Sequence, residues 1–469
     1  MVAMATGSSL LLLLLLLLVA PPFSSSAVVR PGRFNTKAVR SIINRSAKEF
    51  LKDRAQQGVT DFSGRRTNDD QLGSSAADTY GAFIFELSVG TSPQQIPVIM
   101  DITSELIWVQ CGSCTATSCL RYTPLDTTTF MPDLSRYVGC DTQYCQMVVP
   151  GVQPKCNSQY PACRYELDFY AADAINPTWY TSGYLANETF NFDTASVAGI
   201  VFGCSDDITL PDLAGSSGFL GFNRGALSLV TQLQITSFSY FIAPDDTGSN
   251  FVSWNWDEDG APAAVGSRRK SQSTPLLAPT ANQNPYYYVK LTGLLVDGQP
   301  LTSIPAGTFD AQPDGSGGVY MSTTLPVTYL KEAAYNALRR ELVSKIQSQG
   351  VIPVDTPGDL YHLCFLTQYF ANAKVPTLAL VFDGADATME LTVNNYFFDL
   401  PDGQTCMSIL PSTDVSVLGS LLQAGKTMTY DIHGGQLMFQ TAAGVPARSP
   451  VPLIATLLIA WVLGLQTLL

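Results

Sequence analysis

The sequence has few charged residues and very few histidines. Only 14% of its 469 residues are Asp, Glu, Lys or Arg, and its two histidines are His362 and His433. They lie too far apart for a zinc-binding HExxH helix and leave little scope for histidine-dependent catalysis. The formal net charge of −13 excludes the basic surface typical of nucleic-acid binding. No GxSxG elbow, phosphate-binding loop or dinucleotide fingerprint occurs, so neither a cofactor nor a metal is predicted.

The residues that are abundant favour a folded β protein. Hydrophobic residues make up 46% of the chain, beside 36 Gly and 29 Pro. This composition argues against both disorder and a helical bundle, and the length suits two or three core-forming units. We therefore expect an all-β secreted protein.

Both ends of the chain read as targeting segments. The Leu-rich run from Leu10 to Ala20 predicts a signal peptide over residues 1–27, with an uncleaved membrane anchor as the alternative. The apolar tail, within residues 446–469, resembles a glycolipid-anchor signal, and a single membrane span is its alternative.

A basic segment follows the predicted signal peptide. Residues 28–72 contain ten Lys or Arg against five Asp or Glu, which leaves 16 basic and 34 acidic residues in the rest of the chain. A basic segment that lies across an acidic body would act as a pro-segment, and we assign residues 28–77 to it. A basic disordered linker is the alternative.

The cysteines predict disulfides rather than a metal site. After a signal peptide the compartment is oxidising, and a single CxxC, at Cys111 and Cys114, has no second CxxC to complete a zinc site. If the two halves of the chain are separate lobes, Cys364 and Cys406 are the natural pair. The pairing of the other eight stays open: Cys111, Cys114, Cys119, Cys140, Cys145, Cys156, Cys163 and Cys204. Asn187 begins an Asn-Glu-Thr glycosylation sequon.

From residue 81 onward the chain reads as short strands separated by turns. Alternating or apolar runs predict strands at 82–89, 96–100, 106–109, 183–192, 286–291, 378–382 and 436–439. The main helical pattern covers residues 331–349 and has apolar residues at spacing four: Ala334, Leu338, Leu342 and Ile346.

Two pairs of similar segments suggest a duplicated architecture. An apolar strand enters a polar turn at 98–104 and again at 319–324, and an apolar pair is followed by glycine at 218–221 and at 417–419. Two β-lobes related in this way would bring the two polar turns face to face across a cleft.

The motifs resemble one family specifically. The run MDITSELIWVQCGSC from Met100 to Cys114 and the run GFLGFNRGALSL from Gly218 to Leu229 are similar to the first lobe of plant pepsin-like aspartic proteases, the nepenthesin-like group. In the second lobe, the segments at 287–293, 332–338 and 417–435 are similar too. The resemblance implies a bilobal all-β fold, with an N-terminal lobe at 78–270 that carries a Cys-rich insertion at 111–163, and a C-terminal lobe at 271–445.

The resemblance also implies a catalytic dyad, which this sequence alters. Such enzymes use two Asp-Thr/Ser-Gly turns, one per lobe, whose carboxylates share a proton and activate a water; this enzyme class is a standard example of the effect. Here the first Asp is Asp101, followed by Ile102 and Thr103. Ser322 stands where the second Asp is expected, and a serine hydroxyl does not ionise in the working range. Asp314 lies eight residues before Ser322 and is expected to be out of reach.

Other expected site residues come from the same resemblance. Tyr170 aligns with the flap tyrosine, and we assign Ser104 and Trp108 to substrate contacts, although barrel packing is the alternative for Trp108 and for the Tyr286-Tyr287-Tyr288 run. Phe241 replaces a family cysteine, so we expect Cys204 to lack its usual partner.

Three functions remain compatible with the sequence. The first is a catalytically impaired pseudo-protease, at the cell surface or secreted, that binds a peptide or protein in its cleft. The second is an active acid endopeptidase that uses Asp101 in a rearranged site, and the third is an inhibitor-like or recognition protein on the same scaffold. We expect a monomer whose membrane association is through its C-terminal tail.

Overall fold

The structure of the chain, a computed structural model, describes residues 26–29, 84–111, 136–146, 155–157, 160–168, 180–192, 195–209, 216–244, 250–255, 272–279, 284–354, 363–384, 386–400 and 403–441. The apolar tail, Tyr170 and most of the predicted signal peptide, pro-segment and Cys-rich insertion lie outside these residues. No helix within the described ranges is long and apolar enough to span a membrane.

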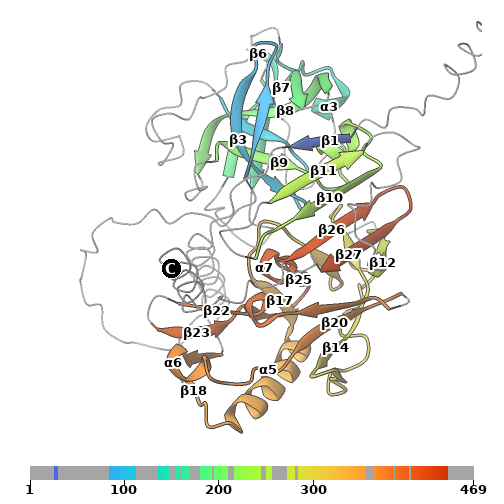
Figure 1. The fold of residues 1–469 in the computed structure, drawn as a ribbon. Helices are drawn as coiled ribbons and strands as arrows, with labels where there is room; N and C mark the ends of the chain where they lie inside the picture. Colours follow the sequence, from blue (N-terminus) through green and yellow to red (C-terminus); the bar gives the residue numbers. More distant parts are fainter. Residues whose placement is uncertain are drawn as a thin grey trace, which may run out of the picture.

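The first half of the chain folds around an eight-stranded sheet with the order β2-β3-β9-β4-β8-β7-β6-β5 (Figure 1). The long β7–β8 hairpin forms its middle, and β2 also pairs with β7. The elements of this half are β2 (Ile84–Val89), β3 (Gln94–Asp101), β4 (Trp108–Gln110), α3 (Gln143–Gln146), β5 (Lys155–Asn157), β6 (Tyr160–Asp168), β7 (Tyr180–Phe192), β8 (Ala195–Thr209), β9 (Gly218–Gly221), α4 (Leu229–Gln232), β10 (Ser237–Phe241) and β11 (Phe251–Asn255).

The second half combines strands of an eleven-stranded sheet with two four-stranded sheets. Its strands are β12 (Gln272–Leu277), β13 (Tyr288–Val289), β14 (Leu291–Val296), β15 (Gln299–Pro300), β16 (Val319–Met321), β17 (Thr328–Lys331), β18 (Pro353–Val354), β19 (Cys364–Leu366), β20 (Leu378–Phe382), β21 (Thr388–Leu391), β22 (Phe397–Asp399), β23 (Gln404–Met407), β24 (Ile409–Ser412), β25 (Ser416–Leu418), β26 (Lys426–Asp431) and β27 (Gln436–Thr441). Its helices are α5 (Glu332–Gln347), α6 (Thr367–Phe370), η2 (Val393–Asn395) and α7 (Ser420–Gln423).

A shared sheet joins the two lobes. Strand β10 of the first half pairs antiparallel with β26 of the second, and the Ser239 and Thr429 hydroxyls are 2.8 Å apart across this junction. At the outer edge, β1 (Ser26–Val29) pairs with β11. Figure 1 shows β10, β11 and β26 between the blue-green and the orange halves of the chain. The fold is therefore all-β and bilobal, as the sequence predicted.

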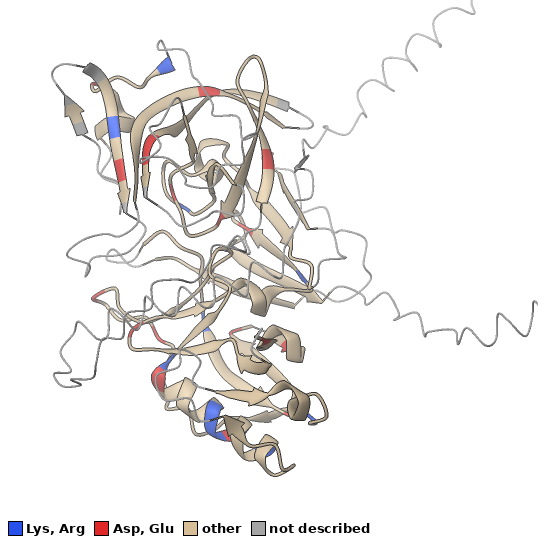
Figure 2. Cartoon of the chain, turned by 90° about the vertical axis from the view of Figure 1, so that its left-hand side faces the viewer, with Lys and Arg blue, Asp and Glu red and all other residues tan. Residues whose placement is uncertain are grey.

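Helix α5 follows the predicted pattern. The predicted range, 331–349, exceeds the observed helix by only a few residues. Ala334, Leu338, Leu342 and Ile346 are all fully buried, because a spacing of four places them on one face of the helix. Arg339, Arg340 and Lys345 also lie on α5, and Figure 2 shows how sparse charged positions are over the rest of the described ribbon.

Four disulfides join described cysteines. Cys364–Cys406 links β19 to β23, and it is the pair that the sequence indicated for the second lobe. In the first lobe the structure settles pairings that the sequence left open: Cys111–Cys204, Cys140–Cys156 and Cys145–Cys163. Cys204 therefore has a partner at the end of β4. These bonds agree with folding in an oxidising compartment of the secretory pathway.

Lys426 is a buried charge in the second lobe. It is 3% exposed at the start of β26, and its Nζ lies 3.4 Å from Asn395 Oδ1. Burial lowers the pKa of Lys426 from 10.5 to about 8, against the opposing charge of Glu390. Protonation of this amine therefore destabilises the fold below pH 8.

Lys426→Met should stabilise the protein at neutral pH. Because the folded pKa lies below the unfolded one, wild-type stability rises as pH increases from about 8 to 10.5. We expect a gain of about 2 kcal/mol at pH 7, after the lost Asn395 contact is allowed for. The gain should shrink by pH 10 in urea unfolding curves; a variant that is less stable at pH 7 contradicts this account.

Candidate functional site

The strand registers relate the two turns. Met100 pairs with Leu220 in the parallel strands β3 and β9, and Met321 pairs with Leu418 in the parallel strands β16 and β25. The neighbouring antiparallel pairs, Trp108 with Phe219 and Tyr329 with Val417, repeat this correspondence. Because Met100 corresponds to Met321, the residues that follow them, Asp101 and Ser322, correspond as well. Ser322 therefore occupies the position that corresponds to Asp101 in the second lobe.

Asp101 ends β3 and is held by its own turn. Its side chain is 6% exposed, and its Oδ1 accepts hydrogen bonds from the Thr103 amide at 2.8 Å and the Thr103 hydroxyl at 2.6 Å. The Phe222 amide, just past β9, donates to the Asp101 carbonyl and fixes the end of the strand. The β-branched Thr103, at the position where the family has glycine, thus supplies a hydroxyl to the carboxyl group.

Ser322 is hydrogen-bonded into its own turn as an alcohol. It is fully buried, and its Oγ accepts from the Leu325 amide at 3.1 Å. The Thr324 hydroxyl lies 3.3 Å from Ser322 Oγ and is close enough to the Asp101 carboxyl to oppose the rise in its pKa. The Thr324 hydroxyl therefore contacts Ser322 and lies beside Asp101. Sequence reasoning missed this role, although a threonine at a family glycine position was a signal for it.

The cross-lobe support of the turns is one-sided. Thr323 Oγ1 accepts from the Ile102 amide at 3.3 Å and donates to the Met100 carbonyl at 2.9 Å. Ile102, the corresponding residue of the first turn, has no hydroxyl to return these bonds. Gln423 also stabilises the second turn, because its Nε2 donates a hydrogen bond to the Ser322 carbonyl at 2.8 Å.

Burial raises the pKa of the Asp101 carboxyl. Hydrogen bonds from Thr103, Ser104 and Thr324 oppose this shift but do not cancel it. Over the part of the chain that the structure describes, no second carboxyl hydrogen-bonds Asp101. Glu105 instead accepts from the Leu227 amide at 3.1 Å, and exposed Asp314 binds Ser316. Proton sharing between two acids is therefore not available among the described residues.

Asp101→Asn should stabilise the protein at neutral pH. An acid whose folded pKa is raised contributes stability below its unfolded pKa and loses it as pH rises through the folded pKa. An asparagine keeps an acceptor for the Thr103 amide and hydroxyl. We expect the variant to be more stable than wild type at pH 7 and equally stable below pH 3.8 in thermal unfolding scans. A variant that loses stability at pH 7 would show that the ionised carboxylate supports the fold.

Aromatic residues of the second lobe lie near Asp101. Half-buried Tyr286 and Tyr320 have ring centroids 4.7 Å apart. Burial, with a further contribution from the Asp101 charge, raises the pKa of Tyr286 to about 12. Burial also raises the pKa of Tyr320, with smaller contributions from neighbouring tyrosines and from Asp101. Tyr287, by contrast, is fully buried and donates to the Phe222 carbonyl at 2.7 Å. The Tyr run thus includes both a packing residue and a residue beside the site.

The other residues that the sequence assigned to the site or to glycosylation differ in burial and in their contacts. Trp108 is fully buried and stacks on Phe219 with ring centroids 5.4 Å apart, so it packs the core and presents no surface to a substrate. Ser104 is half-buried, and its hydroxyl donates to the Leu106 carbonyl. Half-buried Asn187 lies within β7 opposite Val201. Tyr170 lies outside the described residues.

Two lobes that are joined by a shared sheet, each with a related turn at their junction, define the pepsin-like aspartic protease fold. Solved structures support this class. "Crystal structure of edgp" aligns with a TM-score of 0.58 at 14% identity over 90% of this chain and 96% of that chain. The soybean basic 7S globulin aligns with a TM-score of 0.56 at 16% identity over 77% and 92%. At these identities the likeness concerns the fold alone.

The sequence comparisons identify the family. The xylanase inhibitor N-terminal family matches residues 83–253, and the xylanase inhibitor C-terminal family matches residues 286–441. Aspartic proteinase nepenthesin-1 of Nepenthes gracilis is 30% identical over 77% of this chain and 78% of its own length. Nepenthesin-2 of the same plant is 29% identical over 76% and 77%. The chain belongs to the nepenthesin-like group of plant aspartic proteases.

Proposed function

We propose that this protein is a catalytically impaired member of its family that binds a peptide or protein segment in the cleft between its lobes. One observation carries the proposal: Ser322 occupies the position of the second acid and is bonded there as an alcohol, to Thr324 and the Leu325 amide. An aspartic protease needs one ionised and one protonated carboxyl at this point. Asp101 alone supplies only one proton-sharing group.

The same geometry also changes where water can be activated. In an intact dyad the two acids hold a water between them. Here the Thr324 hydroxyl lies 3.3 Å from Ser322 Oγ and close enough to the Asp101 carboxyl to oppose the rise in its pKa. A threonine hydroxyl cannot take up and release a proton as a second carboxylate does. Because it is part of the chain, a substrate cannot displace it as it would displace a water molecule. The half-buried tyrosines beside Asp101, in contrast, still offer aromatic contacts to a bound chain.

The experiment combines cleavage and binding. Wild-type protein is incubated with a denatured protein substrate from pH 2.5 to 6, with and without a pepstatin-type inhibitor, and then with a random octapeptide library. We expect no inhibitor-sensitive cleavage, and bound peptides that are recovered intact. Inhibitor-sensitive cleavage that disappears in Asp101→Ala would overturn the proposal in favour of an acid endopeptidase.

A matched pair of variants tests whether binding uses the cleft. Thr324→Trp adds bulk at the junction beside Asp101, whereas Thr292→Trp makes the same change at an exposed position of β14. Peptide binding should be lost in the first variant and kept in the second. Equal binding by both variants would place the peptides elsewhere on the protein.

A second candidate function follows from the family description, xylanase inhibitor. On this alternative the scaffold recognises a glycoside hydrolase rather than a peptide. Inhibition of a microbial xylanase by the wild-type protein, without peptide retention, would favour it. We further propose an extracellular location with attachment through the C-terminal tail, which release by a phosphatidylinositol-specific phospholipase would test.

A further inference from the structure

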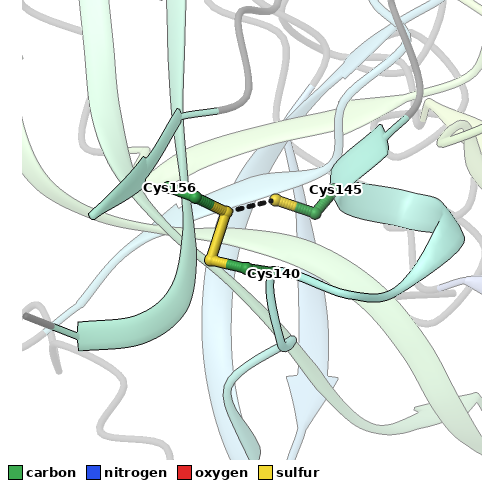
Figure 3. A group of neighbouring side chains, drawn as sticks. All are labelled: Cys140, Cys145 and Cys156. Atoms are coloured by element: carbon green, nitrogen blue, oxygen red, sulfur yellow. Dashed lines mark hydrogen bonds between the residues drawn. A yellow bond between two sulfur atoms is a disulfide. The ribbon is translucent and has the colours of Figure 1, made fainter. Parts of the chain in front are cut away.

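Four cysteines of the first lobe form one continuous cluster of sulfur atoms. Cys140–Cys156 and Cys145–Cys163 are neighbouring disulfides, and the Cys145 and Cys156 Sγ atoms lie 3.3 Å apart (Figure 3). The Sγ atoms of Cys140, Cys145 and Cys156 all lie within 4.8 Å of one another. Each of them is already in a disulfide, so the cluster offers no thiolate to a metal as it stands.

The backbone allows a second pairing of the same four residues. Cys156 and Cys163 lie directly opposite each other on β5 and β6. Gly139, which precedes Cys140, forms a bridge with Ala162, and the Cys163 amide donates to the Val138 carbonyl at 2.8 Å. The chain on either side of Cys140 therefore already runs beside Cys163. Bonds between Cys145 and Cys156 and between Cys140 and Cys163 would connect the same three segments.

The two disulfides differ in their access to solvent. Cys156 is exposed and Cys140 is half-buried, whereas Cys145 and Cys163 are buried. A thiol in solution can therefore reach the outer disulfide but not the inner one. Cys156 is the only one of the four that is both exposed and shown in contact with a sulfur of the inner disulfide.

We propose that these residues form a thiol–disulfide exchange site in which Cys156 passes exchange from solvent to the buried disulfide. The co-reactant is a small thiol or a protein dithiol of the secretory pathway. Its thiolate attacks Cys140 Sγ, forms a mixed disulfide there and releases the Cys156 thiolate. The Cys156 thiolate attacks Cys145 Sγ, which forms Cys145–Cys156 and releases the Cys163 thiolate.

The last step returns the co-reactant. The Cys163 thiolate attacks Cys140 Sγ, which forms Cys140–Cys163 and expels the original thiolate. Three sulfur–sulfur bonds form and three break, no net electron is transferred, and the thiol acts as a catalyst. Because β6 continues from Cys163 toward Asp168, the pairing determines how the β6–β7 hairpin is tied to α3.

Peptide mapping of the folded full chain tests this proposal. The protein is mapped before and after equilibration with reduced and oxidised glutathione at pH 8, with acid quenching and alkylation at each point. We expect equilibration to yield both pairings, including peptides joined through Cys145–Cys156 and Cys140–Cys163. A single pairing, unchanged before and after equilibration, overturns the proposal.

A matched pair of variants tests the relay role of Cys156. In Cys140→Ser, Cys156 becomes a free thiol beside the inner disulfide, so after acid quenching and unfolding, which expose buried Cys163 to the reagent, maleimide labelling should be divided between Cys156 and Cys163 without added thiol. In Cys156→Ser the freed thiol is Cys140, and labelling should stay on Cys140. Labelling confined to Cys156 in the first variant contradicts the relay. Because wild-type mapping needs no variant, the proposal stays testable if either variant misfolds.

Discussion

Restoring an acid at position 322 is expected to produce acid proteolysis. The change is Ser322→Asp together with Ile102→Thr, Thr103→Gly and Thr324→Gly, which rebuilds both turns of the family pattern. It supplies the missing carboxyl, removes the Thr324 hydroxyl from Asp101, and allows the cross-lobe hydroxyl bonds to become reciprocal. Since removing one member of a catalytic unit costs about 10³-fold or more, repair should raise the cleavage rate by at least about 10³-fold.

The matched control for this repair is Ser322→Asn in the same background. Asparagine has nearly the shape of aspartate but cannot ionise or share a proton. Cleavage of a denatured protein at pH 2.5 to 6 should appear only in the aspartate version, and a pepstatin-type inhibitor should abolish it. If the two versions are equally active, or if wild type matches the repaired enzyme, the missing acid is not what limits catalysis.

Gly419→Ala is expected to destabilise the second lobe severely. Gly419 follows β25 and corresponds to Gly221, the last residue of β9, and its φ of −75° imposes no left-handed conformation. The constraint is steric, because an added methyl group would collide with the carbonyl oxygen of Val327 and approach that of Leu325 within 2.8 Å. Backbone must move to relieve both contacts, so we expect a loss of at least about 3 kcal/mol.

Gly293→Ala is the control for this substitution. Gly293 lies in β14 of the same lobe, and an added methyl group there would meet nothing within 4 Å. Its variant should unfold in urea within about 0.5 kcal/mol of wild type. If Gly419→Ala is equally mild, the backbone around the second turn leaves room for a methyl group beside the Val327 carbonyl, and the steric account is wrong.

Sequence patterns predicted the duplicated architecture because they depend on local chemistry. The similar segments are the end of β3 with its turn at 98–104 and β16 with its turn at 319–324. The segment at 218–221 is β9, and the segment at 417–419 covers the last two residues of β25 and Gly419. Strand alternation, a helix with spacing four and the glycine-ended strands each reflect packing rules that act over a few residues. The family resemblance supplied the connection between the two lobes.

The details of the site depended on contacts across the molecule. Thr324 and Asp101 are distant in sequence, so their proximity followed from no local pattern. The aromatic contact of Tyr286 with Tyr320 likewise joins two separate strands. Trp108 was assigned to substrate contact because of its place in the motif, but strand β4 turns it into the core against Phe219. The pairing of the eight first-lobe cysteines could not be read from spacing, since eight cysteines allow 105 pairings.

Carbon-13 NMR titration of the Asp101 carboxyl group, assigned by its absence in Asp101→Asn, measures most directly whether this acid has a partner. We expect a single protonation step at a pKa above 3.8, because burial raises the pKa and no second carboxyl shares the proton. Two coupled steps, one far below and one above the ordinary value, would instead show that another acid completes a dyad and would contradict the account.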